Sequence, residues 1–134
     1  MARIALDAMG GDFAPRATVA GALLALRELD PAHSVLLVGR TAVIEEQLAE
    51  LVGGEFRDVA GQRDRLPIVE APDVIEMTDK PTVALKGSKA NSSMVVGLRL
   101  QTEGKADAFV SAGNTGAQMA ASTVLLKLHG AIKR

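Results

Sequence analysis

Short apolar runs alternate along the chain with longer stretches in which apolar residues recur every three or four positions. A short run is typical of a buried strand, and the longer spacing is typical of an amphipathic helix. Three runs suit strands in this way: residues 3–8, 34–38 and 108–110. Residues 66–69 are a weaker fourth candidate, because Pro67 suits only the start or the edge of a strand.

Four helices are expected between and after these strands. Pro15 suits the first turn of the first helix, where a missing N–H costs nothing. Ser92 or Ser93 suits the cap of the third helix, and the last helix is expected over residues 114–128. The positions expected to face the core are Val19, Leu23, Leu26 and Leu29, then Ile44, Leu48 and Leu51, then Met94, Val95 and Leu98, and finally Ala117, Ala121, Val124, Leu125 and Leu128.

The remaining stretches are mostly polar. Residues 55–65 show no clear period, so we expect a loop there. Pro72 and Pro81 argue against one continuous helix between them, and a single helical turn is expected over residues 82–86. Four charged side chains are expected at the surface: Arg65, Glu70, Glu76 and Asp79.

Strands that alternate with helices predict an α/β fold, with a mostly parallel sheet covered on both faces. The length of 134 residues suits one domain. Apolar residues make up 48% of the chain and charged residues 23%, which is the balance of a folded globular protein. No apolar run reaches the roughly 18 residues of a membrane-spanning helix.

Charge and composition exclude several functions. The net charge of -1 argues against nucleic acid as a main partner, because binding a phosphate backbone needs a concentrated basic surface. The absence of cysteine excludes disulfides, thiolate zinc sites and cysteine nucleophiles, and it fits a cytoplasmic protein. His33 and His129 are interpreted as surface or capping residues rather than as metal ligands or bases.

The first expected strand leads into a glycine turn, residues 7–12 (Asp-Ala-Met-Gly-Gly-Asp). Ligands of open α/β sheets bind beyond the carboxyl ends of the strands, so this turn is a candidate site. The paired glycines Gly10 and Gly11 allow a ligand to approach the backbone closely. A tight turn in which Asp12 caps the following helix explains the same residues.

A second glycine turn, residues 111–116, leads from the last expected strand into the last helix. The N–H groups and the dipole of a helix start favour an anion, and Ser111, Asn114 and Thr115 add neutral hydrogen-bonding groups. The turn has neither the Walker spacing nor the dinucleotide fingerprint. A helix capped by Asn114 or Thr115 is the alternative.

Lysines precede the helix that begins near Ser92 and Ser93. They are Lys86 and Lys89, and positive charge beside the N–H groups of a helix start is suited to phosphate. A solvated basic loop explains them equally well.

Taken together, these loops resemble a known family. Residues 7–12 followed by Ala14-Pro15, then residues 92–98, then residues 106–117, are similar in sequence and order to signatures of the PlsX phosphate acyltransferases. The resemblance runs from about Ile4 to Leu128. It departs from the family at Phe13, where many members have histidine, and at Gly87 and Asn91, in a stretch that is usually more basic with an aspartate before the serines.

The resemblance implies a three-layer αβα fold similar to the isocitrate dehydrogenase and phosphotransacetylase group. Family members are more than twice this long, so residues 1–134 are expected to be the N-terminal half of such a domain. The part absent from the chain would complete the fold and contribute to peripheral membrane association. We expect a cytoplasmic homodimer as the full-length protein.

The implied reaction transfers an acyl group from acyl carrier protein to inorganic phosphate, giving acyl phosphate for phospholipid synthesis, with no metal or organic cofactor. Phosphate is itself the nucleophile, so positioning and electrostatic stabilisation suffice. Lys89 and Asn114 are the candidate catalytic residues. The candidate phosphate-binding residues are Gly10, Gly11, Asp12, Ser92, Ser93, Gly113, Thr115 and Gly116.

Three other functions stay open. A phosphotransacetylase-like enzyme would use a coenzyme A thioester as the acyl donor. A non-enzymatic module would bind an anion or assist assembly without turnover. A dinucleotide-dependent dehydrogenase ranks below both, because the glycine fingerprint is absent. The isolated chain is expected to be inactive.

Overall fold

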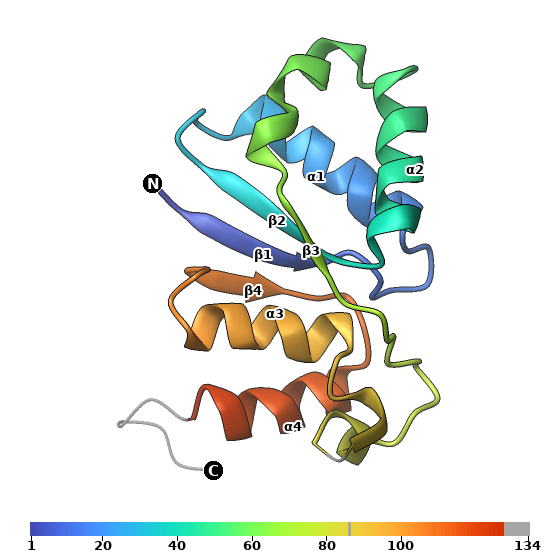
Figure 1. Cartoon of the computed structure of the whole chain (residues 1–134), viewed down its shortest axis with the longest axis vertical. Helices are drawn as coiled ribbons and strands as arrows, with labels where there is room; N and C mark the ends of the chain where they lie inside the picture. Colours follow the sequence, from blue (N-terminus) through green and yellow to red (C-terminus); the bar gives the residue numbers. More distant parts are fainter. Residues whose placement is uncertain (86, 128–134) are drawn as a thin grey trace.

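A computed structural model describes residues 1–85 and 87–127 and contains one parallel sheet (Figure 1). Its strands are β1 (Arg3–Asp7), β2 (Ser34–Gly39), β3 (Ile68–Glu70) and β4 (Ala108–Val110), in the order β3-β2-β1-β4. All three strand pairs are parallel, which confirms the predicted sheet. Pro67 stands just before β3, where its carbonyl accepts a hydrogen bond from the N–H of Leu37.

The helices cover both faces of the sheet. They are α1 (Arg16–Glu28), α2 (Thr41–Val52), α3 (Ser93–Thr102) and α4 (Thr115–Leu125). In Figure 1, α1 and α2 lie on one side of the sheet and α3 lies on the other, with α4 packed against α3. The expected αβα layering is therefore confirmed, and all four helices begin at the edge where the strands end.

The core consists of one apolar cluster on the side of α1 and α2 and others on the side of α3. Most positions predicted to face the core are buried: Val19, Leu23, Leu26, Ile44, Leu48, Leu51, Met94, Val95, Leu98, Ala117 and Ala121. Leu29 is half-buried, immediately after α1.

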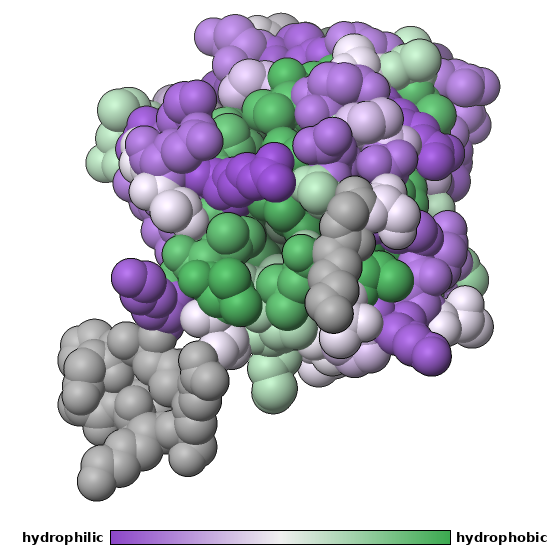
Figure 2. Space-filling model, turned by 60° about the horizontal axis from the view of Figure 1, so that its bottom comes forward, coloured by the Kyte–Doolittle hydropathy of each residue, from purple (hydrophilic) through white to green (hydrophobic). Residues whose placement is uncertain are grey.

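The prediction for the end of α4 is wrong at Val124, which is 54% exposed. The face of α4 that packs against the core passes through Ala117, Ala121 and Leu125, so Val124 lies beside this face. Figure 2 turns this end of the molecule toward the viewer and shows apolar residues gathered on it. Leu128 lies outside the described residues, as do Lys86 and His129.

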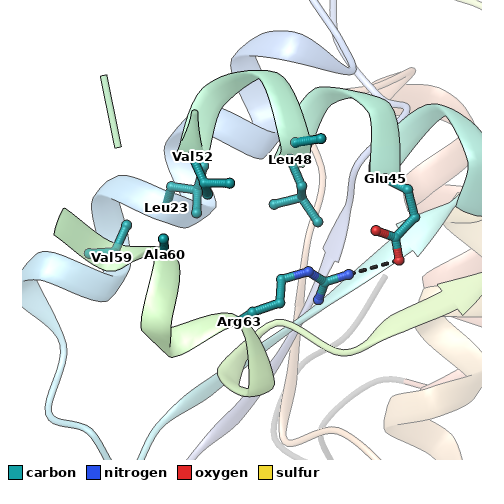
Figure 3. Close-up of a pocket in the computed structure, with 8 residues that line it drawn as sticks. Leu23, Glu45, Leu48, Val52, Val59, Ala60 and Arg63 are labelled. Carbon is teal, nitrogen blue, oxygen red and sulfur yellow. Dashed lines mark hydrogen bonds and ion pairs between the residues drawn. The ribbon is translucent and has the colours of Figure 1, made fainter. Parts of the chain in front are cut away.

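Residues 55–65, expected to be a loop, contain the 3-10 helix η1 (Arg57–Arg65). Val59 within it and Phe56 at its N-cap are buried in the core, so tertiary packing stabilises a segment that has no helical period in its sequence. A pocket of about 220 Å³ lies between η1, α1 and α2. Figure 3 shows its apolar lining and the ion pair at one side, in which Arg63 lies 2.9 Å from Glu45.

Two of the four charged residues expected at the surface, Arg65 and Glu70, form hydrogen bonds that link neighbouring elements. The guanidinium of Arg65 donates to the carbonyls of Asp30 at 2.8 Å and His33 at 3.0 Å, which follow α1. The carboxylate of Glu70, at the end of β3, accepts from the N–H and the hydroxyl of Thr41 at the start of α2. These hydrogen bonds lower the pKa of Glu70, with the hydroxyl contributing most.

The segment between β3 and α3 is irregular, as Pro72 and Pro81 predict. It contains two short 3-10 turns, η2 (Pro81–Ala84) and η3 (Gly87–Lys89), in the region where a helical turn is expected. Among the described helices, none has both the length and the apolar character needed to cross a membrane.

Candidate functional site

The loops predicted to form the site meet at the carboxyl edge of the sheet, around Asp7. This residue ends β1 and is only 2% exposed. Its carboxylate accepts hydrogen bonds from the hydroxyl of Ser93 at 2.5 Å, the hydroxyl of Ser111 at 2.8 Å and the N–H of Met9 at 3.1 Å. The first glycine turn, the start of α3 and the end of β4 are thus joined at one side chain.

Glycines from two of these loops pack directly on the cluster. A methyl group at Gly10 would lie 2.5 Å from Oδ2 of Asp7. At Gly113 it would lie 3.1 Å from Oγ of Ser111. Gly11 has a φ of 117°, in the region that favours glycine, and its position faces Ala112. Close approach therefore requires glycine at position 10 and backbone conformation favours it at position 11, whereas the contact at Gly113 is tight.

Asn114 is the N-cap of α4, as the capping alternative predicts. Its Oδ1 accepts from the N–H of Ala117 at 3.0 Å. Its Nδ2 donates to the carbonyls of Asp79 at 2.9 Å and Glu76 at 3.1 Å. Both ends of the amide are engaged and the residue is buried, so a role toward the acyl carbonyl would require one of these hydrogen bonds to be exchanged.

Lys89 forms an ion pair with Asp79. Its Nζ lies 2.5 Å from Oδ2 of Asp79 and donates to the carbonyl of Val74 at 2.9 Å. The hydrogen bond from Lys89, followed by one from the N–H of Glu76, lowers the pKa of Asp79. Asp79 is therefore not a solitary surface charge, and the charge of Lys89 is locally matched.

The remaining candidates at the helix starts divide between buried and exposed positions. Ser92 is fully buried and caps α3 by accepting from the N–H of Val95 at 3.2 Å. Gly116 lies against Pro81, whose Cγ would be 2.8 Å from an added methyl group. Thr115 begins α4 and is exposed.

Asp12 is exposed and does not cap α1, so that alternative is wrong: Pro15 occupies the N-cap without a side-chain hydrogen bond. Gly10, Gly11 and Asp12 instead line a hollow of about 290 Å³, together with Phe13, Ala14, Ala17, Thr18 and Ala112. Phe13 is 81% exposed at its rim. This hollow lies beside the first glycine turn, and its lining includes neither Lys89 nor any residue of α3 or α4.

Sequence reasoning missed the central position of Asp7 and the role of Ser111 as its partner. The available signal was a carboxylate at the last position of an apolar strand, where a buried charge needs hydrogen-bond partners. Within residues 1–85 and 87–127, no three His, Asp or Glu side chains form a cluster that would hold a metal ion.

Comparison with known proteins decides the family. A sequence profile described as "Fatty acid synthesis protein" matches residues 2–134. The chain belongs to this family, that of the PlsX phosphate acyltransferases. Relatives named phosphate acyltransferase are 50% identical in Heliobacterium modesticaldum, 48% in Salinibacter ruber and 46% in Herpetosiphon aurantiacus, each over 132 residues.

These matches cover 98% of the chain but only 36%, 37% and 33% of the three relatives. The chain thus spans about a third of the length of the PlsX relatives it matches, rather than the expected half. The signatures at residues 7–12, 92–98 and 106–117 correspond to the loops that meet at Asp7. The recognition of a PlsX sequence is therefore confirmed, and the loops that carry it share one edge of the sheet.

Proposed function

We propose that this chain forms the phosphate-binding edge of a phosphate acyltransferase that uses acyl carrier protein as the donor. In this reaction a phosphate oxygen attacks the thioester carbonyl, the C–S bond breaks, and acyl phosphate and the carrier thiol are released. The observation that supports the proposal best is the meeting of the PlsX loops at the carboxyl edge of the sheet, where α/β proteins bind ligands.

The site suits a reaction in which the substrate phosphate is itself the nucleophile. Helix starts supply N–H groups, and the hollow at Gly10 and Gly11 gives access to the strand ends. Lys89 would supply positive charge on exchanging Asp79, its partner in the ion pair, for phosphate. Catalysis then rests on holding phosphate and stabilising the oxyanion of the tetrahedral intermediate. We assign Lys89 and Asn114 to that work, and Ser92, Ser93 and Gly113 to shaping the edge.

Thr115 and Gly116 complete the proposed phosphate-binding set with the two glycines of the first turn, and Asp12 shapes the hollow beside them without contacting phosphate. The proposal further includes a homodimer in the cytoplasm, with peripheral membrane contact made by regions outside this chain. Residues 1–134 alone are proposed to lack turnover, because the chain spans only about a third of its relatives.

A hybrid enzyme tests the activity. Residues 1–134 replace the matching region of the Heliobacterium relative, and acyl phosphate formation is measured with acyl carrier protein or coenzyme A thioesters. We expect turnover by the hybrid with the carrier-protein donor and none by the isolated chain. A hybrid that prefers coenzyme A would establish the phosphotransacetylase-like alternative. A folded hybrid without turnover, beside an active Heliobacterium enzyme, would contradict the proposal.

A further inference from the structure

Asp7 contacts all three loops of the proposed site, yet the proposed reaction gives it no task. Its Oδ1 accepts from Ser93, the first residue of α3, and from the N–H of Met9 in the first glycine turn. Its Oδ2 accepts from Ser111, which follows β4 and precedes α4. Because the contacts span 86 and 104 positions of sequence, they join segments that no local structure would hold together.

The loops are also shaped around this carboxylate. The position of a methyl group at Gly10 would be 2.5 Å from Oδ2 of Asp7 and 3.0 Å from Oγ of Ser111. At Gly113 the corresponding position is 3.5 Å from Oδ2 of Asp7. The backbone of the first loop therefore approaches the carboxylate more closely than a side chain at Gly10 would permit, and the third loop lies in ordinary contact with it.

The hydrogen bonds have a fixed direction. Both serine hydroxyls donate to Asp7, and the oxygen of Ser111 in turn accepts from the N–H of Gly113 at 3.0 Å. A carboxylate can accept from both sides at once. An asparagine at this position has one accepting oxygen and one donating nitrogen, so it would have to reverse one of the two serines.

We propose that Asp7 is the positioning residue of the phosphate site: it holds the starts of α3 and α4 against the Gly10–Gly11 turn without contacting phosphate. This inference rests on the proposed function, because the groups it positions are those assigned to phosphate. A carboxylate beside the bound anion would repel it. Asp7 is 2% exposed and covered by hydroxyl and N–H donors, which suits an indirect role.

Asp7→Asn tests the inference, since it keeps the shape of the side chain and removes one acceptor. Inorganic phosphate is titrated into the 134-residue chain while the amide NMR signals of residues 93–95 and 113–117 are followed. We expect phosphate affinity to fall about tenfold, as for the loss of one or two net hydrogen bonds. Ser93→Ala and Ser111→Ala should weaken binding too, and neither should add its full effect to Asp7→Asn.

The matched control is Asp107→Asn. Asp107 lies just before β4 and accepts from the backbone N–H of Arg3 at 2.8 Å, so it joins the same two strands at their opposite ends. Its loss should lower stability while leaving the phosphate affinity of the folded chain unchanged. A purely structural role for Asp7 would give the same result as this control.

The outcomes distinguish the positioning role of Asp7 from the phosphate site itself. Unchanged or tighter phosphate binding by Asp7→Asn overturns the positioning role and leaves the phosphate site standing. No response of the wild-type chain to phosphate overturns the phosphate site in this chain. The positioning role then falls with that site, because the inference rests on it. If Asp7→Asn does not fold, Ser111→Ala serves for the same measurements.

Discussion

Lys89 and Asp79 form an ion pair at the carboxyl edge of the sheet, and Asn114 donates to the backbone carbonyl of the same aspartate. The segment between β3 and α3 is thereby closed on itself by the ion pair and attached to the start of α4 by Asn114. Asp79 also accepts from the N–H of Glu76 at 2.7 Å, which closes a small turn in that segment. The two residues proposed for catalysis are therefore joined through one acidic residue.

The ion pair predicts a specific pH dependence. Folding lowers the pKa of Asp79 below its ordinary value of 3.8, chiefly through the hydrogen bond from Lys89. The pair therefore stabilises the folded chain above that value, and the contribution is lost as the pH falls through the lower folded pKa. The difference in unfolding free energy between wild type and Asp79→Asn should stay constant above about pH 5 and shrink below it.

Urea denaturation at a series of pH values measures this difference. Removing the partner provides the control: in a Lys89→Met background, Asp79→Asn should have a smaller and less pH-dependent effect. A difference that grows as the pH falls would contradict the assignment of this ion pair.

Asn114→Ala should destabilise the chain even without any ligand. It removes the cap of α4, which is worth about 0.5–2 kcal/mol. It also removes the donor to the carbonyls of Glu76 and Asp79. Asn114→Asp keeps a capping oxygen but loses the donor, so its unfolding free energy should fall between those of wild type and the alanine variant. Equal stability of all three proteins in urea would exclude both structural roles.

Substituting alanine for two helix glycines, Gly97 and Gly21, should change the unfolding free energy in opposite directions. An added methyl at Gly97 in α3 would lie 2.7 Å from the ring of Phe109, so Gly97→Ala should lower the unfolding free energy by about 1–3 kcal/mol. At Gly21 in α1 nothing lies within 4 Å, and Gly21→Ala should raise it by up to about 1 kcal/mol. Thermal and urea unfolding of the two variants give the comparison, and effects of the same sign would be inconsistent with this packing.

Arg65→Lys should lower the free energy of unfolding although the positive charge is kept. The planar guanidinium donates at once to the carbonyls of Asp30 and His33, and a lysine cannot reproduce that fork. The unfolding free energy should fall by about 1–3 kcal/mol. Arg57→Lys is the control, since Arg57 is exposed and makes one backbone hydrogen bond, to the carbonyl of Gly53. A cost no larger than that of the control would show that the fork contributes nothing.

The sheet and the main helices could be predicted because their signal is local. Val19, Leu23 and Leu26 repeat at the period of a helix, and each strand contains a short apolar run. The 3-10 helix at Arg57–Arg65 carries no such period. Val59 is buried in the core and Arg65 donates to the carbonyls of Leu26 and Leu29 at the end of α1, and neither contact is visible in the sequence.

For the candidate site, too, local sequence predicted the location but not the contacts within it. Glycine turns at strand ends indicate a ligand-binding edge, and the structure brings the first and last of them together. Which polar groups pair there depends on tertiary structure. Ser111 donates to Asp7 from 104 positions away in the sequence, and Lys89 pairs with Asp79 across an irregular segment. Periodicity contains no information on such pairs.

The strand order β3-β2-β1-β4 places the first strand between two partners that are synthesised at very different times. β2 follows β1 within about thirty residues, whereas β4 begins at residue 108. Until β4 arrives, β1 has an unpaired edge, the kind of surface that recruits strands from other chains. Emerging nascent chains should therefore be most prone to aggregation until Asp107 and Ser111 close the sheet against Arg3 and Asp7, when the shorter β4 replaces β1 as the edge strand.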